Sequence, residues 1–290
     1  MFVFFIALCY NTAMNCVRVK AYAKINLTLF VCGAADGYHK LDSLVASVGL
    51  YDTVTVRKRR DDRVTVKMLG AEIQGENNAV KAAELFIKEF ATCGADITVI
   101  KRIPMGAGLG GSSADAAGVL NALARLYRIK DSERLAKLAD ATGSDTRYML
   151  GGGWARLFGR GDTVKRVSGR LRARLLLLVP DEKVSTPQCF AAFDKNGVVG
   201  GDSDEAERAV NRGDVYALAA SLHNALMPAA VSLSGGISVC ADKLKELDSL
   251  AVNMTGSGSG VYALFASRRL CVRAKRSYRG TARAYILKTR

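Results

Sequence analysis

The stretch from Pro104 to Leu120, Pro-Met-Gly-Ala-Gly-Leu-Gly-Gly-Ser-Ser-Ala-Asp-Ala-Ala-Gly-Val-Leu, decides how the rest of the chain is interpreted. A strand-like run over 97–100 precedes it, and a helical pattern over 114–127 follows. Ser112 and Ser113 stand at the expected helix start, where serine caps free N–H groups. These N–H groups and the helix dipole attract anions, so the stretch predicts a phosphate-binding loop. Its four glycines can adopt positive φ and let the backbone approach a ligand closely; they are Gly106, Gly108, Gly110 and Gly111.

This loop is neither of the two commoner phosphate-binding motifs. It lacks the Gly-Lys-Ser/Thr ending of a Walker A loop, and its glycines miss the spacing of the dinucleotide-binding motif. The alternative is a flexible glycine-rich loop before a capped helix. The order of strand, glycines, serines and alanine-rich helix favours the phosphate-binding interpretation.

The composition of the 290-residue chain is strongly basic, with 42 Lys+Arg against 27 Asp+Glu and a net charge of +15. This charge suits a partner rich in phosphate, either a nucleotide or a nucleic acid. Much of the excess lies in Arg57-Lys58-Arg59-Arg60 and in the tail from Arg268 to Arg290. Aromatic residues make up 7% and form no RNA-binding signature, so we expect a solvated basic surface and no nucleic-acid partner.

The first ten residues are apolar but too few to span a membrane, and they lack the charged start of a signal peptide. We expect the natural chain to begin near Met14, which makes residues 1–13 an extraneous extension. No other stretch approaches membrane length, so no membrane partner is expected. The seven cysteines form no close pair, which argues against a disulfide framework and favours a reducing, cytoplasmic compartment.

The hydrophobic patterns predict a chain of mixed helices and strands. Strands are expected at 17–22, 24–31, 96–101, 154–158, 174–179, 261–265 and 282–287. The runs 52–56 and 63–68 look like a β-hairpin, whereas 39–47 fits a strand or a helix. Helices are expected at 79–90, 114–127, 132–142, 186–193, 204–211, 215–220, 237–250 and 268–278. We place one domain over 1–165 and a second over 166–290.

Four single residues stand out, each with a structural alternative. Lys24 lies amid apolar residues of a strand, which is costly unless it meets an anion, although an edge-strand lysine can also face solvent. Asp145 follows Gly-Ser, where aspartate is usually a cap or turn residue. Asn77 fits a plain helix cap as well as a ligand contact, and Phe190 fits a core position as well as a stacking one.

Three motifs together resemble the GHMP kinases, those of galactose, homoserine, mevalonate and phosphomevalonate. Pro-x-x-x-Gly-Leu-Gly-x-Ser-Ser-x-x-Ala is similar to their ATP-binding motif, and the stretch from Thr255 to Gly260 is similar to their third motif. Ala21-Tyr-Ala-Lys-Ile-Asn-Leu27 and Asp36-Gly-Tyr-His39 resemble one branch of the family, whose acceptor is an alcohol linked to cytidine diphosphate. The similarity runs from about Val17 to Arg290.

The resemblance implies a two-domain α+β fold with the active site in the interdomain cleft. It implies transfer of phosphate from ATP to the 2-hydroxyl of a cytidine diphosphate-linked methylerythritol in the non-mevalonate isoprenoid pathway, by a monomer or homodimer. Asp145 would be the catalytic base, with Lys24 orienting it and offsetting negative charge, and Ser113 would meet Mg²⁺. ATP contacts are expected at Pro104, Met105, Gly106, Ala107, Gly108, Leu109, Gly110, Gly111, Ser112, Ser113, Ala114 and Asn77. Contacts to the acceptor are expected at Asn26, Tyr38, His39, Phe190, Gly256 and Gly258.

One departure from the family pattern adjoins the expected base. Thr146-Arg147 stands where the family usually has Val-Pro, and Arg147 adds a charge that could lower the pKa of Asp145 or bind phosphate. Three other functions stay open. They are a GHMP kinase of the homoserine or mevalonate type, a non-catalytic nucleotide-binding relative, and a basic RNA-binding protein.

Overall fold

The computed structural model describes residues 14–35, 37–71, 77–169 and 171–290, so the expected extension 1–13 lies outside the described residues. The chain forms two compact units. The first contains Leu50–Ile103, Gly110–Gly151 and the described residues up to Ala23; the second contains Lys24–Gly49, Pro104–Leu109 and Gly152–Arg290. Neither unit is one continuous block of sequence, and the domain boundary at 165 stays a prediction.

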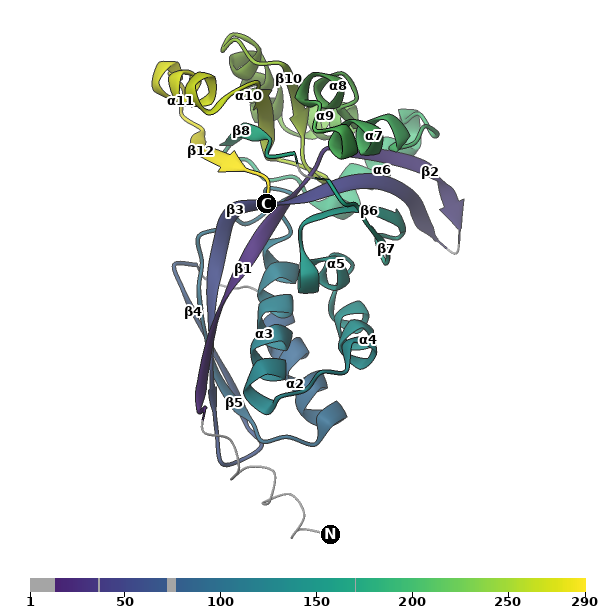
Figure 1. Cartoon of the computed structure of the whole chain (residues 1–290). Helices are drawn as coiled ribbons and strands as arrows, with labels where there is room; N and C mark the ends of the chain where they lie inside the picture. The colour runs from purple at the N-terminus through teal and green to yellow at the C-terminus, as the bar shows by residue number, and fades with distance from the viewer. Residues whose placement is uncertain (1–13, 36, 72–76, 170) are drawn as a thin grey trace. The chain divides into compact units, whose positions relative to one another are not determined.

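Four strands open the chain, and helices and strands are mixed along the rest of it (Figure 1). The strands are β1 (Cys16–Asn26), β2 (Thr28–Ala35), β3 (Tyr38–Lys58), β4 (Val64–Leu69), β5 (Ala95–Ile100), β6 (Trp154–Gly159), β7 (Thr163–Arg166), β8 (Arg174–Val179), β9 (His223–Asn224), β10 (Ala251–Met254), β11 (Val261–Phe265) and β12 (Arg283–Lys288). The helices are α2 (Asn78–Phe90), α3 (Gly111–Tyr127), α4 (Ser132–Thr142), α5 (Thr146–Gly151), α6 (Thr186–Asn196), α7 (Asp204–Arg212), α8 (Val215–Ala220), α9 (Met227–Leu233), α10 (Gly235–Lys245) and α11 (Arg268–Ser277).

In the first unit, α2, α3 and α4 lie on one side of the strands (Figure 1). β5 pairs antiparallel with β3 and parallel with β4, so it lies between the two strands that were expected to form a hairpin. That prediction was wrong because β5 buries Ala95, Ile97 and Val99 at alternate positions, and so offers both neighbours a regular ladder. The local pattern predicts a strand at 96–101 but does not reveal that it lies between the other two.

β3 resolves the ambiguity over 39–47, because it is one strand of 21 residues that continues through 52–56. Its N-terminal part pairs with β2 and β6 in the second unit, and its C-terminal part pairs with β5 in the first. Residues 42–48 are buried on both faces. Burial on both faces removes the alternation that usually identifies a strand, which explains why this run looked ambiguous.

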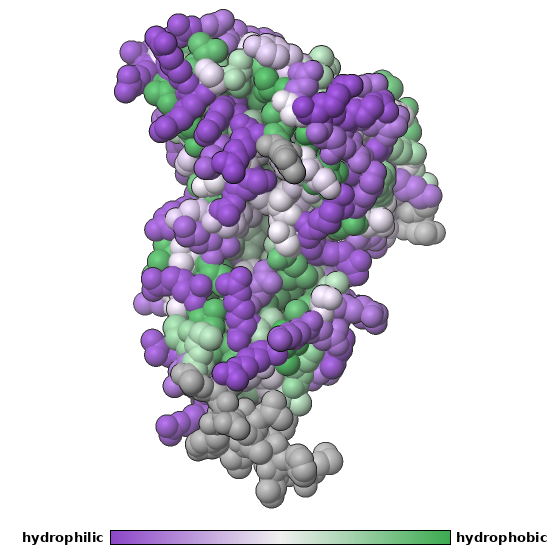
Figure 2. Space-filling view, viewed as in Figure 1, coloured by the Kyte–Doolittle hydropathy of each residue, from purple (hydrophilic) through white to green (hydrophobic). Residues whose placement is uncertain are grey.

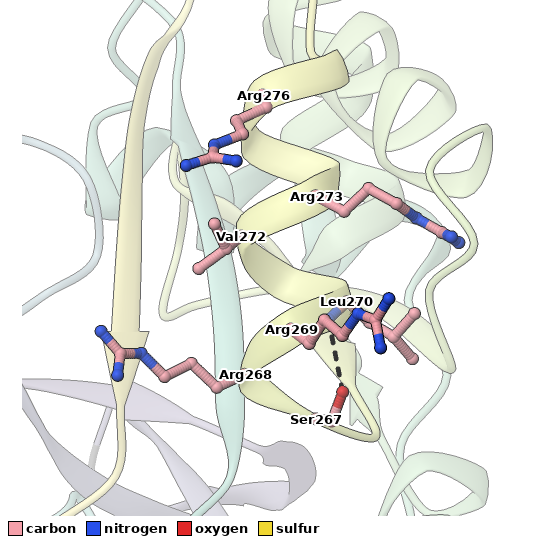
Figure 3. A pocket seen from close by; sticks show the side chains of 7 residues that line it. All are labelled: Ser267, Arg268, Arg269, Leu270, Val272, Arg273 and Arg276. Carbon is pink, nitrogen blue, oxygen red and sulfur yellow. Dashed lines mark hydrogen bonds between the residues drawn. The ribbon is translucent and has the colours of Figure 1, made fainter.

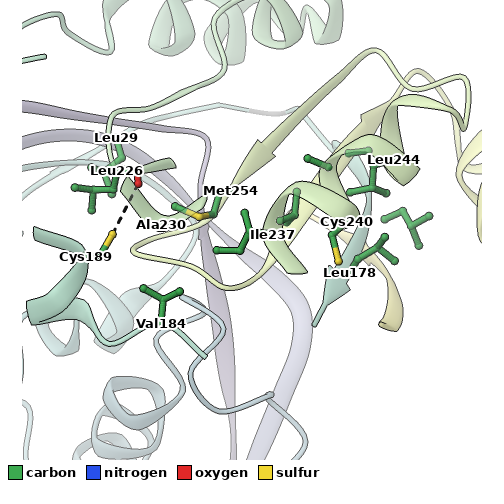
Figure 4. Packing of buried hydrophobic residues seen from close by; sticks show 14 of the residues in the cluster. Leu29, Leu178, Val184, Cys189, Leu226, Ala230, Ile237, Cys240, Leu244 and Met254 are labelled. Atoms are coloured by element: carbon green, nitrogen blue, oxygen red, sulfur yellow. Dashed lines mark hydrogen bonds between the residues drawn. The ribbon is translucent and has the colours of Figure 1, made fainter. Parts of the chain in front are cut away.

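The second unit also holds an antiparallel sheet in the order β10-β11-β8-β12. The predicted buried strand at 174–179 is confirmed, since Leu175 to Leu178 are fully buried. Around it, the strands and helices α6, α9, α10 and α11 enclose one apolar cluster, part of which Figure 4 shows. Thiols are free at Cys16, Cys32, Cys189, Cys240 and Cys271, but Cys93 is disulfide-bonded, contrary to the expectation for the cysteines.

The longer predicted helices are confirmed within a few residues. α10 ends at Lys245 rather than at 250, and the edge strand β10 begins at Ala251. Short elements such as α5, β7 and α9 were not predicted. In the described ranges, no helix combines the length and apolar character needed to cross a bilayer.

Candidate functional site

The loop before α3 takes a conformation that depends on glycine. Gly106, Gly108 and Gly110 have φ of 70°, 69° and 67°. A Cβ atom on Gly108 would lie 1.9 Å from the carbonyl oxygen of Thr255, which no side chain tolerates. The alternate glycines therefore serve both the backbone conformation and a close approach between two backbones.

The glycine turn over 255–260 packs directly on this loop. Ser259 N donates to the carbonyl oxygen of Gly106 at 3.1 Å, and Thr255 Oγ1 donates to that of Gly108 at 3.2 Å. Two segments about 150 residues apart in sequence thus form one backbone-to-backbone layer in the second unit. That Gly256 and Gly258 contact the acceptor stays a prediction.

The start of α3 differs from the expected serine cap. Gly110 is the N-cap residue, in the left-handed conformation, and no side chain caps the helix. Ser112 and Ser113 instead lie in the first turn, because the helix begins three residues earlier than its apolar pattern indicates. The first backbone N–H groups of α3 therefore have no side-chain cap, which is what a helix start that binds an anion requires.

In the first unit, a buried cluster of charged side chains joins the residues that precede the glycine loop to those that follow it. Lys101 Nζ lies 2.5 Å from both Asp52 Oδ2 and Asp115 Oδ2, and all three side chains are almost fully buried. Asp52 Oδ1 also accepts hydrogen bonds from the N–H groups of Arg102 and Ile103. Burial raises the pKa of the Asp115 carboxyl to about 7 despite the adjacent ammonium. The cluster thereby ties β3 and the end of β5 to the N-terminal part of α3.

The expected base lies on a turn that approaches the start of α3 within the first unit. Gly143 brings its backbone close to Ser113 and Asn78: a Cβ atom there would lie 3.4 Å from Ser113 Oγ and 3.3 Å from Asn78 Nδ2. Asp145 follows on this turn and is half-buried, and its carbonyl oxygen accepts the Met149 N–H of α5. A hydroxyl and a carboxylate residue are therefore brought into one neighbourhood.

Thr146 and Arg147, which replace the family's Val-Pro, both lie in or beside helices of the first unit. Thr146 begins α5 and is fully buried. Arg147 Nε lies 2.8 Å from Asp140 Oδ1 of α4, so its guanidinium forms an ion pair across two helices. The charge that Arg147 adds is thus partly balanced by Asp140.

Lys24 and Asn26 sit on β1 in the second unit, both buried. Lys24 Nζ donates to Asn26 Oδ1 at 2.7 Å, and that oxygen also accepts the Gly256 N–H at 3.0 Å. Asn26 Nδ2 donates to Ser43 Oγ at 2.8 Å. Asn26 therefore ties β1 to the glycine turn and orients the lysine, which is a positioning contact beyond the acceptor contact expected of it.

Tyr38 and His39 begin β3, where consecutive side chains point to opposite faces. The Arg160 guanidinium lies 3.6 Å from the ring centre of Tyr38. His39 stacks on Phe190 with ring centres 4.5 Å apart, and its Nε2 lies 2.6 Å from Asp194 Oδ1. Phe190 thus faces the imidazole, and the exposed ring of Tyr38 faces an arginine.

The structure collects the expected site residues in two groups. The first unit holds Asn77, Gly110, Gly111, Ser112, Ser113, Ala114 and Asp145, and the second holds the remainder, including the loop 104–109. Asn77 caps α2, its Oδ1 accepting the Ala79 N–H at 2.9 Å. Sequence reasoning missed the residues that support these groups, because charged or polar residues at unremarkable positions give no local signal: Asn78, Lys101, Arg160, Lys183 and Asp194.

The basic tail predicted from composition forms an exposed surface on α11. Figure 2 shows hydrophilic residues gathered over this helix. Arg268, Val272 and Arg276 extend on one side of α11, and Arg269 and Arg273 extend on the other (Figure 3). These residues line a depression in the surface, which contains none of the expected site residues. No cluster of three metal-binding side chains of the His, Cys, Asp or Glu type occurs among the described residues.

Comparisons with known proteins agree with this architecture. The family described as GHMP kinases N terminal domain matches residues 77–155, and GHMP kinases C terminal matches 206–280. A 4-diphosphocytidyl-2-C-methyl-D-erythritol kinase of Cutibacterium acnes is 38% identical over 258 residues, 83% of each chain. A crystal structure of a 4-(cytidine 5'-diphospho)-2C-methyl-D-erythritol kinase has a TM-score of 0.81 at 30% identity, covering 94% of this chain and 98% of the other. A homoserine kinase from Cytophaga hutchinsonii, with a TM-score of 0.70 at 14% identity over 96% of each chain, shares the fold. The expected α+β fold is confirmed.

Proposed function

The chain belongs to the GHMP kinase family, and we propose that it phosphorylates the 2-hydroxyl of 4-diphosphocytidyl-2-C-methyl-D-erythritol with ATP, in the non-mevalonate isoprenoid pathway. The observation that carries this proposal is the 38% identity, over 83% of each chain, with a kinase of that name. The Tyr38-His39 pair supports it, because an aromatic ring and an imidazole suit a cytosine base. Family membership makes the chain an enzyme, a small-molecule kinase that uses ATP.

The phosphate groups of ATP bind at the glycine loop and the start of α3. Support comes from the first N–H groups of α3, which no side chain caps, and from the positive φ of Gly106, Gly108 and Gly110. Asn77 is proposed to lie near the adenine, although its side-chain oxygen already caps α2. In this arrangement the protein contributes mainly positioning and electrostatic stabilisation, as phosphoryl transfer requires.

Asp145 accepts the proton of the acceptor hydroxyl while that oxygen forms a bond to the γ-phosphorus. The bond between the γ-phosphorus and its bridging oxygen breaks, and ADP leaves with the negative charge. Lys24 offsets this charge, and Asn26 holds the lysine ammonium at 2.7 Å. The half-buried place of Asp145 at the start of α5 leaves it reachable by a substrate.

The residues near the turn at Gly143 fit Mg²⁺. Ser113 offers a hydroxyl beside this turn, and an oxygen donor of this kind is what Mg²⁺ prefers. When bound, Mg²⁺ supplies charge neutralisation on the phosphates.

The cytidine half of the acceptor is read by Tyr38 and His39. His39 is held by Asp194 and packed on Phe190, so its imidazole has a defined orientation for a contact with the base edge. We further propose that the enzyme acts in the cytoplasm as a monomer or homodimer, without nucleic acid. The free buried thiols Cys189, Cys240 and Cys271 fit a reducing compartment, whereas the disulfide at Cys93 counts against it.

A coupled assay of ADP release tests the substrate directly. The purified chain receives ATP, Mg²⁺ and one of three alcohols: the cytidylated methylerythritol, homoserine or mevalonate. We expect turnover with the first alone. Turnover with homoserine or mevalonate would reassign the substrate. ATP binding without turnover of any alcohol would favour the non-catalytic relative, and salt-sensitive RNA binding without ATP binding would favour an RNA-binding protein.

Replacing the base tests the mechanism. Asp145→Asn should keep the fold and ATP binding but lower kcat by about two decades or more, the usual contribution of a general base. Asp248→Asn, which alters an exposed partner of Arg273, is the matched control and should leave kcat unchanged. A near-wild-type kcat in Asp145→Asn would remove this residue from the mechanism.

A further inference from the structure

Lys183 lies across the glycine loop, although it is distant from the loop in sequence. A Cβ atom built on Gly106 would lie 3.0 Å from Cδ, 3.2 Å from Cγ and 3.5 Å from Cβ of Lys183. The aliphatic part of the lysine therefore packs against the α-carbon of Gly106. The two residues belong to the same unit, so this contact is a feature of that unit alone.

The residues on either side of Lys183 fix the backbone there. Glu182 Oε2 accepts hydrogen bonds from Ser234 Oγ at 2.6 Å and from the Gly236 N–H at 3.2 Å. Val184 is buried in the apolar cluster of the second unit. With one neighbour anchored to α10 and the other in the core, Lys183 is held where its stem meets Gly106.

The loop has no cation of its own. Residues 104–114 contain neither lysine nor arginine, although a nucleotide triphosphate carries several negative charges. Lys101 is the lysine nearest in sequence, but it is buried and bound to Asp52 and Asp115. Lys183 is exposed and forms no ion pair with a carboxylate of the described residues.

We propose that Lys183 is a further phosphate-binding residue, whose ammonium binds the triphosphate of the nucleotide held on the glycine loop. This inference rests on the proposed function, because it takes ATP as the ligand of the loop. The lysine of a Walker A loop follows its glycines directly, whereas here the cation comes from the segment between β8 and α6. The competing explanation is that the aliphatic stem merely covers Gly106, with the ammonium in water.

Calorimetric titration of the full chain with ATP and AMP separates these explanations. Lys183→Met keeps an aliphatic stem over Gly106 but removes the charge, and Lys183→Arg keeps the charge. We expect Lys183→Met to weaken ATP binding about ten-fold, as loss of one exposed charge-assisted contact does, with little change for AMP. Lys183→Arg should retain most of the ATP affinity, and Lys130→Met, at an exposed loop position, should match the wild type.

Two results would overturn the inference. One is an unchanged ATP affinity in Lys183→Met, and the other is an equal loss for ATP and AMP, which would indicate a packing role. Melting temperatures of all variants show whether folding has changed. These binding measurements need no acceptor, so failure to phosphorylate the cytidylated alcohol would refute the proposed function while a selective loss of ATP affinity would still support Lys183 as a phosphate ligand.

Discussion

The glycine loop and the Tyr38–His39 end of β3 belong to the same unit but are built in different ways. The loop is held by backbone groups, with the Gly108 α-carbon against the Thr255 carbonyl and the Ser259 N–H on the Gly106 oxygen. Tyr38 and His39 are instead held by side chains, through Arg160, Phe190 and Asp194. A single substitution cannot replace a backbone group, whereas it can replace a side chain. On the proposed roles, phosphate binding would depend on a fixed loop and acceptor choice on replaceable side chains.

Gly108→Ala should have the largest effect on the backbone-held loop. A methyl group at 1.9 Å from the Thr255 oxygen, on a residue with φ of 69°, should cost about 2–4 kcal/mol of unfolding free energy. The displaced loop should lower kcat/KM for ATP by about two decades. Chemical denaturation and initial rates measure both quantities.

Gly213→Ala is the matched control for this variant. Gly213 has φ of 72° but no atom within 4 Å of a built Cβ, so it carries the backbone strain without the clash. We expect a loss of about 1 kcal/mol and unchanged activity. Equal destabilisation by the two variants would show that the contact with Thr255 does not hold the loop.

Tyr38→Ala should have the next largest effect and should act on the acceptor alone. Stacking of a base on an aromatic ring contributes roughly 1–3 kcal/mol, so KM for the cytidylated alcohol should rise by about one to two decades. KM for ATP and the melting temperature should hardly move, and Tyr216→Ala, also exposed, should leave both Michaelis constants unchanged. If both constants rose in step with lost stability, Tyr38 would be a structural residue of the turn.

His39→Ala should change selectivity more than rate. In the proposed role the imidazole edge would distinguish cytosine from uracil, so the preference for the cytidine over the uridine form should fall by about ten-fold. Asp194→Asn keeps a polar partner for His39 and should lower the preference only about two- to three-fold. Competition assays with the two nucleotide forms measure the ratio, and an unchanged ratio in both variants would separate His39 from base recognition.

The smallest expected effect concerns pH and β2, the strand that pairs with Tyr38 and His39. His223 stacks on Phe30 of β2 with ring centres 4.4 Å apart, and burial lowers the pKa of its imidazole below 6.5. The unfolded chain therefore takes up this proton first, so His223 destabilises the folded state as pH falls below about 6.5. Melting temperatures from pH 7 to 5 should fall less steeply in His223→Gln. A parallel fall in both proteins would contradict the prediction.

Much of the site was predictable because its signals are local. Alternate glycines followed by serines indicate a phosphate loop, and Asn77 before an apolar periodic run indicates the start of α2, which its side chain caps. The helix cap at Ser112 and Ser113 was placed too late, since Gly110 needs no side-chain signal to begin α3. The roles of Asp145 and Lys24 rest on resemblance, because a single carboxylate or ammonium group carries no local mark of catalysis.

By itself, the sequence determined the family, the glycine loop and most helices and strands, because each depends on residues adjacent in the chain. Only the tertiary structure placed β5 between β3 and β4, brought the turn at 255–260 onto Gly108, and laid Lys183 across Gly106. It also joined Lys101, Asp52 and Asp115 in one buried cluster. These arrangements join residues that are mostly far apart in sequence, and their energy comes from burial and close packing, which no local pattern encodes.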